Sequence, residues 1–323
     1  MNIAFLAFAV VPLAIFLLGV ITGGLSNVTS GGAGLFTIYV LTNYASLVIQ
    51  RSTGTVLAAS TIMVLVGAIT FHRKRQVNSF LAITVGLSGV AGAFLAAEWA
   101  SSINPTSLER YFGLFTLGLA IYTGYRFLSE RRKVNQTKFE AKIADPASLA
   151  SDSALSDSKS LSSPQSSSSS SSSSLQKSSS SANLTRFAGK DPLALAIQLT
   201  NGILIGFATG LFGVGLASLS IVLFILLFRL DVNTALGTSL FASFFRYLGG
   251  SAGYLATSQI DLFYFVVLVV GGALGSIAGA RFILGGNQQG SGLRSKENYV
   301  KLIIVGIMLF ISYEFLLKFL IFH

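Results

Sequence analysis

The sequence predicts an all-α polytopic membrane protein, built as two inverted repeats of about five hydrophobic segments each, with broken or re-entrant glycine-rich helices. Three observations predict this class: the apolar composition, the long uncharged stretches, and a glycine pattern that occurs twice. Of the 323 residues, 52% are apolar and 11% are charged, and the mean hydropathy is +0.71. A soluble domain usually carries about 25% charged residues. The composition therefore indicates lipid as the solvent.

Three stretches without a charged residue are long enough for membrane spans, since a span needs about 20 mostly apolar residues. They cover residues 2–50, 77–97 and 192–228. In lipid every backbone polar group must be satisfied internally, so we expect these spans to be helical.

Ten hydrophobic segments follow one another, and a polar linker separates the first five from the last five. The segments lie near residues 3–25, 33–49, 54–71, 79–97, 111–128, 193–212, 216–229, 235–256, 262–284 and 299–320. The first membrane repeat is expected to cover residues 1–128 and the second residues 191–323. The first segment lacks the basic start of a signal peptide and is too long for one, so we expect a retained span.

The linker covers residues 129–190, which begin with Arg131, Arg132 and Lys133 and continue as a serine tract. Such a stretch cannot bury enough apolar surface to fold, so we expect it to be disordered. Basic residues beside spans favour the cytoplasmic side, which predicts a cytoplasmic linker.

The two halves share a pattern of small residues. A shift of 183 positions lays the first half on the second without a gap for about 75 residues. The matched pairs include Gly19 with Gly202, Gly23 with Gly206, Gly32 with Gly215, Gly54 with Gly237, Ala59 with Ala242, Gly67 with Gly250, Gly89 with Gly272 and Gly92 with Gly275. This many matches in one register indicate an internal repeat.

The loop charges predict that the repeat is inverted. The basic loop at 72–75 and the basic start of the linker at 131–133 should be cytoplasmic. The loop at 257–261, which is equivalent to the first of these, has no basic residue and should be external. Equivalent loops on opposite sides require an odd number of crossings per half. Five crossings satisfy every loop, and so would three crossings with a re-entrant pair. Inverted repeats are typical of secondary transporters.

Catalysis, metal binding and cofactor binding are not expected. The chain has no cysteine, and its two histidines, His72 and His323, lie at segment ends. A haem, a metal ion or a serine-protease dyad would need histidine at membrane depth. The net charge of +10 comes from basic residues in loops beside spans, so it indicates membrane topology rather than nucleic-acid binding. We therefore do not expect an enzyme.

Each half contains a glycine-rich stretch, residues 23–34 in the first half and 206–215 in the second, that we expect to unwind a helix at membrane depth. Glycine weakens a helix by about 1 kcal/mol per residue, and irregular backbone at that depth lines a cavity or is buried in protein. Free N–H groups at a helix N-terminus attract anions. The alternative is that the glycines only allow close helix packing. The candidate substrate-binding residues here are Ser26, Asn27, Thr29, Ser30, Gly31 and Gly32 in the first half, and Thr209, Gly210, Gly213 and Gly215 in the second.

Further candidates are hydroxyl residues near the start of one span in each half. Thr55 follows Gly54, and Thr238 and Ser239 follow Gly237. Their hydroxyls would bind a ligand oxygen or, alternatively, only cap a helix.

A charged residue lies in the middle of the hydrophobic segment near 235–256. Arg246 has Met63 as its partner in the repeat, and a charge at this depth is costly and usually functional. It would attract the anion or, alternatively, pair with Glu314 or with backbone carbonyls. Glu314 in the last segment would take up a proton for coupling, or else lie as a paired carboxylate near the membrane surface.

Five stretches in the second half resemble a known family in their order and spacing. They are 206–215, 234–240 (TALGTSL), 251–254 (SAGY), 259–261 (QID) and 271–281 (GGALGSIAGAR). Together they resemble the TauE/SafE sulfite exporter family, most strongly over residues 202–283 and more weakly over 19–97. The chain departs from the family at Leu216, where a third glycine often stands, and in its long serine linker. The resemblance implies transport of sulfite, organosulfonates or related sulfur-containing anions.

These observations predict a secondary carrier for a small anion, located in the plasma membrane. An anion channel of the same architecture is the first alternative, and a membrane scaffold that uses the serine linker for interactions is the second. The expected partners are the small anionic substrate, the lipid bilayer and a coupling ion, proton or sodium. No nucleic acid is expected, and a homo-oligomer is left open.

Overall fold

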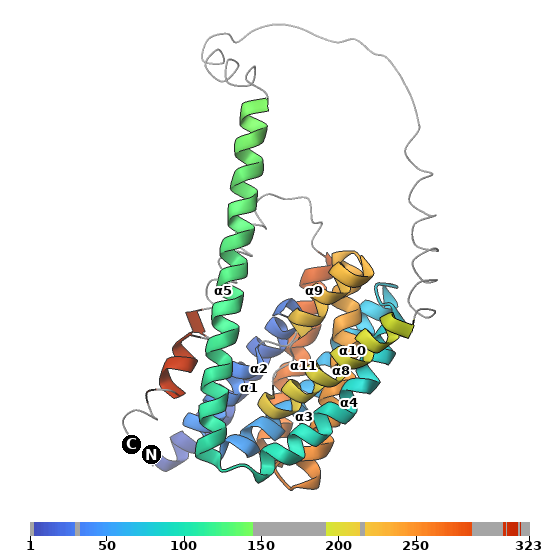
Figure 1. The fold of residues 1–323 in the computed structure, drawn as a ribbon. Helices are drawn as coiled ribbons and strands as arrows, with labels where there is room; N and C mark the ends of the chain where they lie inside the picture. Colours follow the sequence, from blue (N-terminus) through green and yellow to red (C-terminus); the bar gives the residue numbers. More distant parts are fainter. Residues whose placement is uncertain are drawn as a thin grey trace, which may run out of the picture.

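The computed structural model describes residues 3–29, 33–144, 192–213, 217–285, 306–307, 309–315 and 317, and these residues contain helices and no strand (Figure 1). The helices are α1 (Ile3–Thr29), α2 (Gly34–Asn43), α3 (Ile49–Arg73), α4 (Ser79–Ser102), α5 (Pro105–Ala144), α8 (Pro192–Phe212), α9 (Ala217–Phe228), α10 (Val232–Ala256) and α11 (Leu262–Gly285). Residues 309–315 are also helical.

Several helices are suited to a bilayer by length and composition. Within the described residues, four helices are long and apolar enough to cross a membrane, namely α3, α4, α11 and the part of α8 from Leu195 to Phe212. The outer surface carries large apolar side chains such as Leu17, Leu87 and Leu95. An apolar surface of this kind is stable in lipid and not in water. The predicted class, an all-α polytopic membrane protein, is confirmed.

The first and last residues of the helices repeat along the chain with the same shift that aligns the glycines of the two halves. α3 and α10 have 25 residues each and begin at positions 49 and 232, while α4 and α11 have 24 each and begin at 79 and 262. Both differences are 183. The non-glycine residues with positive φ repeat as well: Ser46 and Arg229 have φ of 54° and 50°, and Arg75 and Ser258 both have 56°. The two halves therefore share one backbone plan.

Polar caps explain where several helices begin. The Asn78 side chain accepts a hydrogen bond from the Leu81 N–H at the start of α4. Its equivalent, Asp261, accepts from the Phe263 N–H at the start of α11. Asn and Asp are preferred caps because their side chains satisfy N–H groups that have no partner in the first turn.

The central helices α3 and α10 run antiparallel. A Cβ atom added to Gly54, near the start of α3, would lie 2.8 Å from the Cβ of Tyr254, near the end of α10. A Cβ added to Gly237, near the start of α10, would lie 3.2 Å from the Cβ of Phe71, near the end of α3. Equivalent ends of the two halves therefore lie at opposite faces, as an inverted repeat requires.

The halves exchange helices, because α1 packs along α11 and α8 packs along α4. A Cβ on Gly23 would lie 2.7 Å from the Cα of Gly272, and a Cβ on Gly206 would lie 2.7 Å from the Cα of Gly89. Glycine at these positions allows the backbones to touch, as in other membrane helix pairs. We call α1, α2, α3 and α11 the first bundle, and α8, α9, α10 and α4 the second bundle. Each bundle contains helices from both halves.

Helix α5 is longer than the sequence indicated. It has 40 residues and continues through Ala144, beyond residue 128, where the first repeat was expected to end and the linker to begin. Residues 129–144 are rich in Glu, Arg, Lys, Gln and Ala, which favour helix even without an apolar face. Figure 1 shows α5 running beside the bundles and extending well past them. Its membrane part contacts α8, since the rings of Phe115 and Phe212 stack at 4.0 Å.

Candidate functional site

The helix breaks come later than the first glycines of each glycine-rich stretch. α1 continues to Thr29 and α8 to Phe212, so Gly23 and Gly206 lie inside helices, at the contacts between helices. Gly210, a predicted site residue, also lies inside α8, and a Cβ there would meet the backbone of Ala93. At these three glycines the structure shows close backbone packing, which was the alternative interpretation of the glycine-rich stretches.

The described residues that border the two helix breaks contact each other. Gly213, just after α8, has φ of +66°, and its N–H donates to the Thr209 carbonyl at 2.8 Å. A Cβ on Gly34, the first residue of α2, would lie 3.3 Å from the Gly213 carbonyl oxygen. Thr209 is fully buried, and its hydroxyl donates to the Ile205 carbonyl at 2.7 Å. The ends of α8 and α2 therefore meet in the interior.

Several predicted site residues lie where the structure gives no side-chain description. Asn27 and Thr29 belong to the last turn of α1, and their side chains are outside the described part. The remaining ones are outside the described residues altogether: Ser30, Gly31, Gly32 and Gly215.

Arg246 is fully buried at the middle of the second bundle. It is the fifteenth of the 25 residues of α10, counted from Val232, and its exposed fraction is 0%. Its Nη1 donates to Ser220 Oγ at 3.0 Å, and its Nη2 donates to Ser243 Oγ at 2.7 Å. The side-chain stem lies against Gly89 of α4, where a Cβ would be 2.9 Å from the Arg246 Cδ.

The guanidinium has no anionic partner among the described residues. Its two hydrogen bonds there go to neutral hydroxyls, and Nε has no hydrogen-bond partner in that part of the chain. A guanidinium has five N–H donors, and two of them are used by hydrogen bonds within the described residues. Ser220 is the fourth residue of α9, close to the positive end of that helix. A buried cation and a helix N-terminus together favour a bound anion.

The predicted alternative of a pair between Arg246 and Glu314 is not formed. Phe315, the neighbour of Glu314, packs against Tyr39 of α2 and Phe112 of α5, with ring centroids 5.9 and 5.2 Å apart. Glu314 is therefore beside α2 and α5, whereas the guanidinium bonds to α9 and α10.

The first bundle has an equivalent site without the charge. Met63 is the fifteenth residue of α3, counted from Ile49. A Cβ on Gly272 would clash with its sulfur, just as a Cβ on Gly89 would clash with the side-chain stem of Arg246. Thr37 and Ser60 are the equivalents of Ser220 and Ser243 at a shift of 183.

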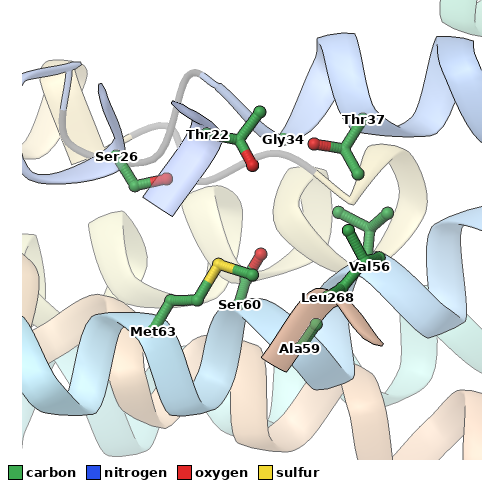
Figure 2. Close-up of a pocket in the computed structure, with 9 residues that line it drawn as sticks. All are labelled: Thr22, Ser26, Gly34, Thr37, Val56, Ala59, Ser60, Met63 and Leu268. Carbon is green, nitrogen blue, oxygen red and sulfur yellow. The ribbon is translucent and has the colours of Figure 1, made fainter. Parts of the chain in front are cut away.

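A cavity of about 10 Å³ lies in the first bundle beside the middle of α3. Its lining consists of Thr22, Ser26, Gly34, Thr37, Val56, Ala59, Ser60, Met63 and Leu268 (Figure 2). Figure 2 shows the hydroxyl oxygens of Thr22, Thr37 and Ser60 turned towards the space between α1, α2 and α3. Ser26, a predicted site residue, contributes a fourth hydroxyl. We call this space the hydroxyl cavity.

Thr55 and Thr238 bind loops of the opposite half. The Asp261 N–H donates to Thr55 Oγ1 at 2.9 Å, and the Asn78 N–H donates to Thr238 Oγ1 at 2.9 Å. These two hydrogen bonds are related by the repeat, so both hydroxyls join the central helices to the loops before α11 and α4. Ser239, the third hydroxyl predicted in this region, is fully buried within α10.

Sequence reasoning did not single out Ser220, Ser243, Thr22, Thr37 or Ser60. The shift of 183 contained a signal for four of them, because it pairs Thr37 with Ser220 and Ser60 with Ser243. A hydroxyl that recurs at the same place in both halves, next to an intramembrane charge in one of them, is a stronger indication than either residue alone.

Comparisons with known proteins agree with a transporter. A family model described as "Sulfite exporter TauE/SafE" matches residues 15–315. The probable membrane transporter protein YunE of Bacillus subtilis (strain 168) is 32% identical over 94 residues, which are 28% of this chain and 34% of that protein. The match thus spans about a third of the relative's length. No solved structure matches.

Proposed function

The chain belongs to the sulfite exporter TauE/SafE family, and from this premise we propose that it is a plasma-membrane secondary carrier for a small sulfur-containing oxyanion, such as sulfite or an organosulfonate. The observation that carries the proposal is the fully buried Arg246, whose partners in the described chain are two neutral hydroxyls.

A buried charge without a counter-ion is costly, and such charges in membrane proteins mark pathways for substrates and ions. Within the described residues nothing anionic offsets the Arg246 guanidinium. A bound anion would offset it each time the carrier is loaded. The planar guanidinium also matches oxygen atoms held on one centre, because it donates two parallel N–H groups.

The two serines would extend this recognition. Ser220 and Ser243 accept hydrogen bonds from the guanidinium, so their own O–H groups can donate to an anion. Three oxygen atoms on one sulfur could then receive hydrogen bonds from the arginine and from both serines. Chloride has no such set of oxygens and would use fewer of these donors.

The packing favours a carrier over a channel. The Arg246 site is formed within the second bundle, by α9 and α10 with α4 alongside, and the helix breaks meet where the two bundles touch, at Gly34 and Gly213. Rocking of one bundle against the other would open the site to each side in turn. Carriers built from inverted repeats work in this way, with substrate bound near the membrane midplane.

The test is transport by the purified full chain in proteoliposomes, with sulfite, methanesulfonate, sulfate and chloride as substrates. We expect saturable sulfite or sulfonate flux and counterflow. Arg246→Met should lower substrate affinity by about ten- to a hundredfold, since a hydrogen bond to a charged group is worth about 1.5–3 kcal/mol. It should still fold, because replacing a buried charge with an apolar side chain removes a desolvation cost.

Arg229→Met is the matched control, because Arg229 is an exposed arginine in the loop before α10. It should leave affinity unchanged. Unchanged affinity in Arg246→Met would contradict the proposed site. Flux that rises linearly with driving force, without counterflow, would instead support the alternative of an anion channel.

A further inference from the structure

The hydroxyl cavity occupies, in the first bundle, the place that the guanidinium fills in the second. Thr37 and Ser60 correspond to Ser220 and Ser243, the two residues that accept hydrogen bonds from Arg246. Met63 replaces the arginine and has no charged head group. The second bundle therefore holds a positive charge at this point, and the first bundle holds a space.

Two of the hydroxyl oxygens around this space, those of Thr22 and Thr37, are free to act as acceptors. Thr22 Oγ1 donates its proton to the Leu18 carbonyl at 2.8 Å, and Thr37 Oγ1 donates to the Ala33 carbonyl at 3.5 Å. Both threonine protons thus go to backbone carbonyls, which leaves the hydroxyl oxygens able to accept, and Figure 2 shows these oxygen atoms turned towards the cavity. Oxygen lone pairs are the ligands that hard cations prefer.

The helix that ends beside the cavity adds to this preference. Ser26 belongs to the last turn of α1, which ends at Thr29. The last carbonyl groups of a helix have no partner within it, and that end carries partial negative charge. Broken helices of transporters use such ends to bind sodium.

Size decides which species fits. The cavity volume is about 10 Å³, which is about the room that one water molecule needs. A bare sodium ion is smaller than a water molecule, so it fits. A sulfur oxyanion, with three oxygens around one centre, is too large.

We propose that the hydroxyl cavity is a sodium site, formed by the hydroxyl oxygens of Thr22, Ser26, Thr37 and Ser60 at the end of α1. Sodium there replaces, in the first bundle, the fixed charge of Arg246 in the second. Its role as the coupling ion rests on the proposed anion transport, whereas its binding does not.

The test measures cation binding without any substrate. The melting temperature of the detergent-purified full chain is followed while choline chloride is exchanged for NaCl or KCl at constant ionic strength. A ligand that binds only the folded state raises this temperature with its concentration. We expect a saturable rise with sodium and a smaller one with potassium.

Two single substitutions locate the site. Ser60→Ala removes one ligand oxygen and should weaken the sodium response by about tenfold. Thr61→Val is the matched control, because Thr61 is the next residue of α3 and its hydroxyl bonds to the Leu57 carbonyl, away from the cavity. It should keep the full response. Equal responses in the two variants would place any sodium site elsewhere.

Met63→Arg copies the second bundle. Its guanidinium should fill the cavity, bond to Thr37 and Ser60, and abolish the sodium response in a folded protein. If sodium and choline affect the wild-type chain equally, the cavity holds water only and the proposal is wrong. A sodium response without sulfur-anion flux would support the cation site and refute the proposed function. Sulfur-anion flux without any sodium response would refute the cation site and support the proposed function.

Discussion

The two membrane bundles have the same backbone plan and differ in the chemistry at their centres. In the second bundle Arg246 lies beside Gly89 and bonds to two serines. In the first bundle Met63 lies beside Gly272, and the equivalent hydroxyls surround a cavity. The helix bounds agree to the residue in the two central helix pairs. The same backbone plan therefore surrounds a buried guanidinium in one bundle and a small cavity in the other, and the most marked difference is Arg246 against Met63.

The comparison of the two bundles requires that the two halves have opposite orientations in the membrane. Cysteine labelling tests this requirement, and it has the largest expected effect of the experiments. Arg75 and Ser258 are equivalent, exposed and share a φ of 56°, so Arg75→Cys and Ser258→Cys carry the same backbone strain. The chain has no native cysteine. We expect an impermeant thiol reagent applied outside cells to label Ser258→Cys fully and Arg75→Cys only after permeabilisation.

The cysteine-free wild type is the control for background labelling. Labelling of both variants from the same side would mean that the repeat is parallel, and the equivalence of the two sites would then fail.

The exchange of helices between halves should make both bundles equally intolerant of side chains at their glycine contacts. A Cβ on Gly23 or on Gly206 would lie 2.7 Å from the backbone of the partner helix. Forcing atoms into a packed interior costs about 1–3 kcal/mol and sometimes more. We expect Gly23→Val and Gly206→Val to reduce the yield of folded monodisperse protein severely and to a similar degree.

Gly118→Ala is the matched control, because a Cβ at Gly118 meets nothing within 4 Å. Its melting temperature should be unchanged or raised, since alanine favours helix over glycine by about 1 kcal/mol. Normal folding of only one of the valine variants would show that the two bundles are not packed alike.

The sequence predicted the spans and the repeat, and it singled out Arg246, because each of these features is visible locally. An arginine in an apolar segment stands out, and a shift of 183 aligns glycines without any knowledge of contacts. The role of the glycines could not be predicted in the same way. Gly23 and Gly206 were expected at helix breaks, yet they lie where α1 meets α11 and where α8 meets α4. Glycine permits both unwinding and close approach, and only the partner helix decides between them.

The hydroxyls of the two sites were not predicted for a related reason. Ser220 and Ser243 stand in apolar helices, where serine is common and usually bonds to its own backbone. Their function follows from the guanidinium that reaches both of them, which depends on how α9 packs against α10.

Replacing the equivalent residues Ser243 and Ser60 should distinguish the two proposed sites, with a moderate effect on anion affinity. Ser243→Ala takes away one partner of Arg246, and we expect anion affinity to fall by about three- to tenfold, as for the loss of one hydrogen bond. Ser60→Ala removes a hydroxyl from the cavity and should leave the anion affinity measured at saturating sodium unchanged. Substrate affinity in proteoliposomes measures both. A similar loss in the two variants would mean that one site, shared by both bundles, binds the anion.

The smallest expected effect is on stability, at Thr55 and Thr238, where equivalent substitutions in the two halves should have equal costs. Each hydroxyl accepts one backbone N–H from a loop of the other half at 2.9 Å, from Asp261 and Asn78 respectively. Valine keeps the shape of threonine and removes the acceptor, so Thr55→Val and Thr238→Val should each cost about 1 kcal/mol in the free energy of unfolding. The two sites lie at opposite ends of the central helices, so the costs should add in the double variant.

Denaturation in SDS or by heat measures these costs, and substrate affinity is the control that should not change. A marked loss of affinity in either variant would return that threonine to the binding site. Unequal costs would show that the halves share a backbone plan without sharing its energetics.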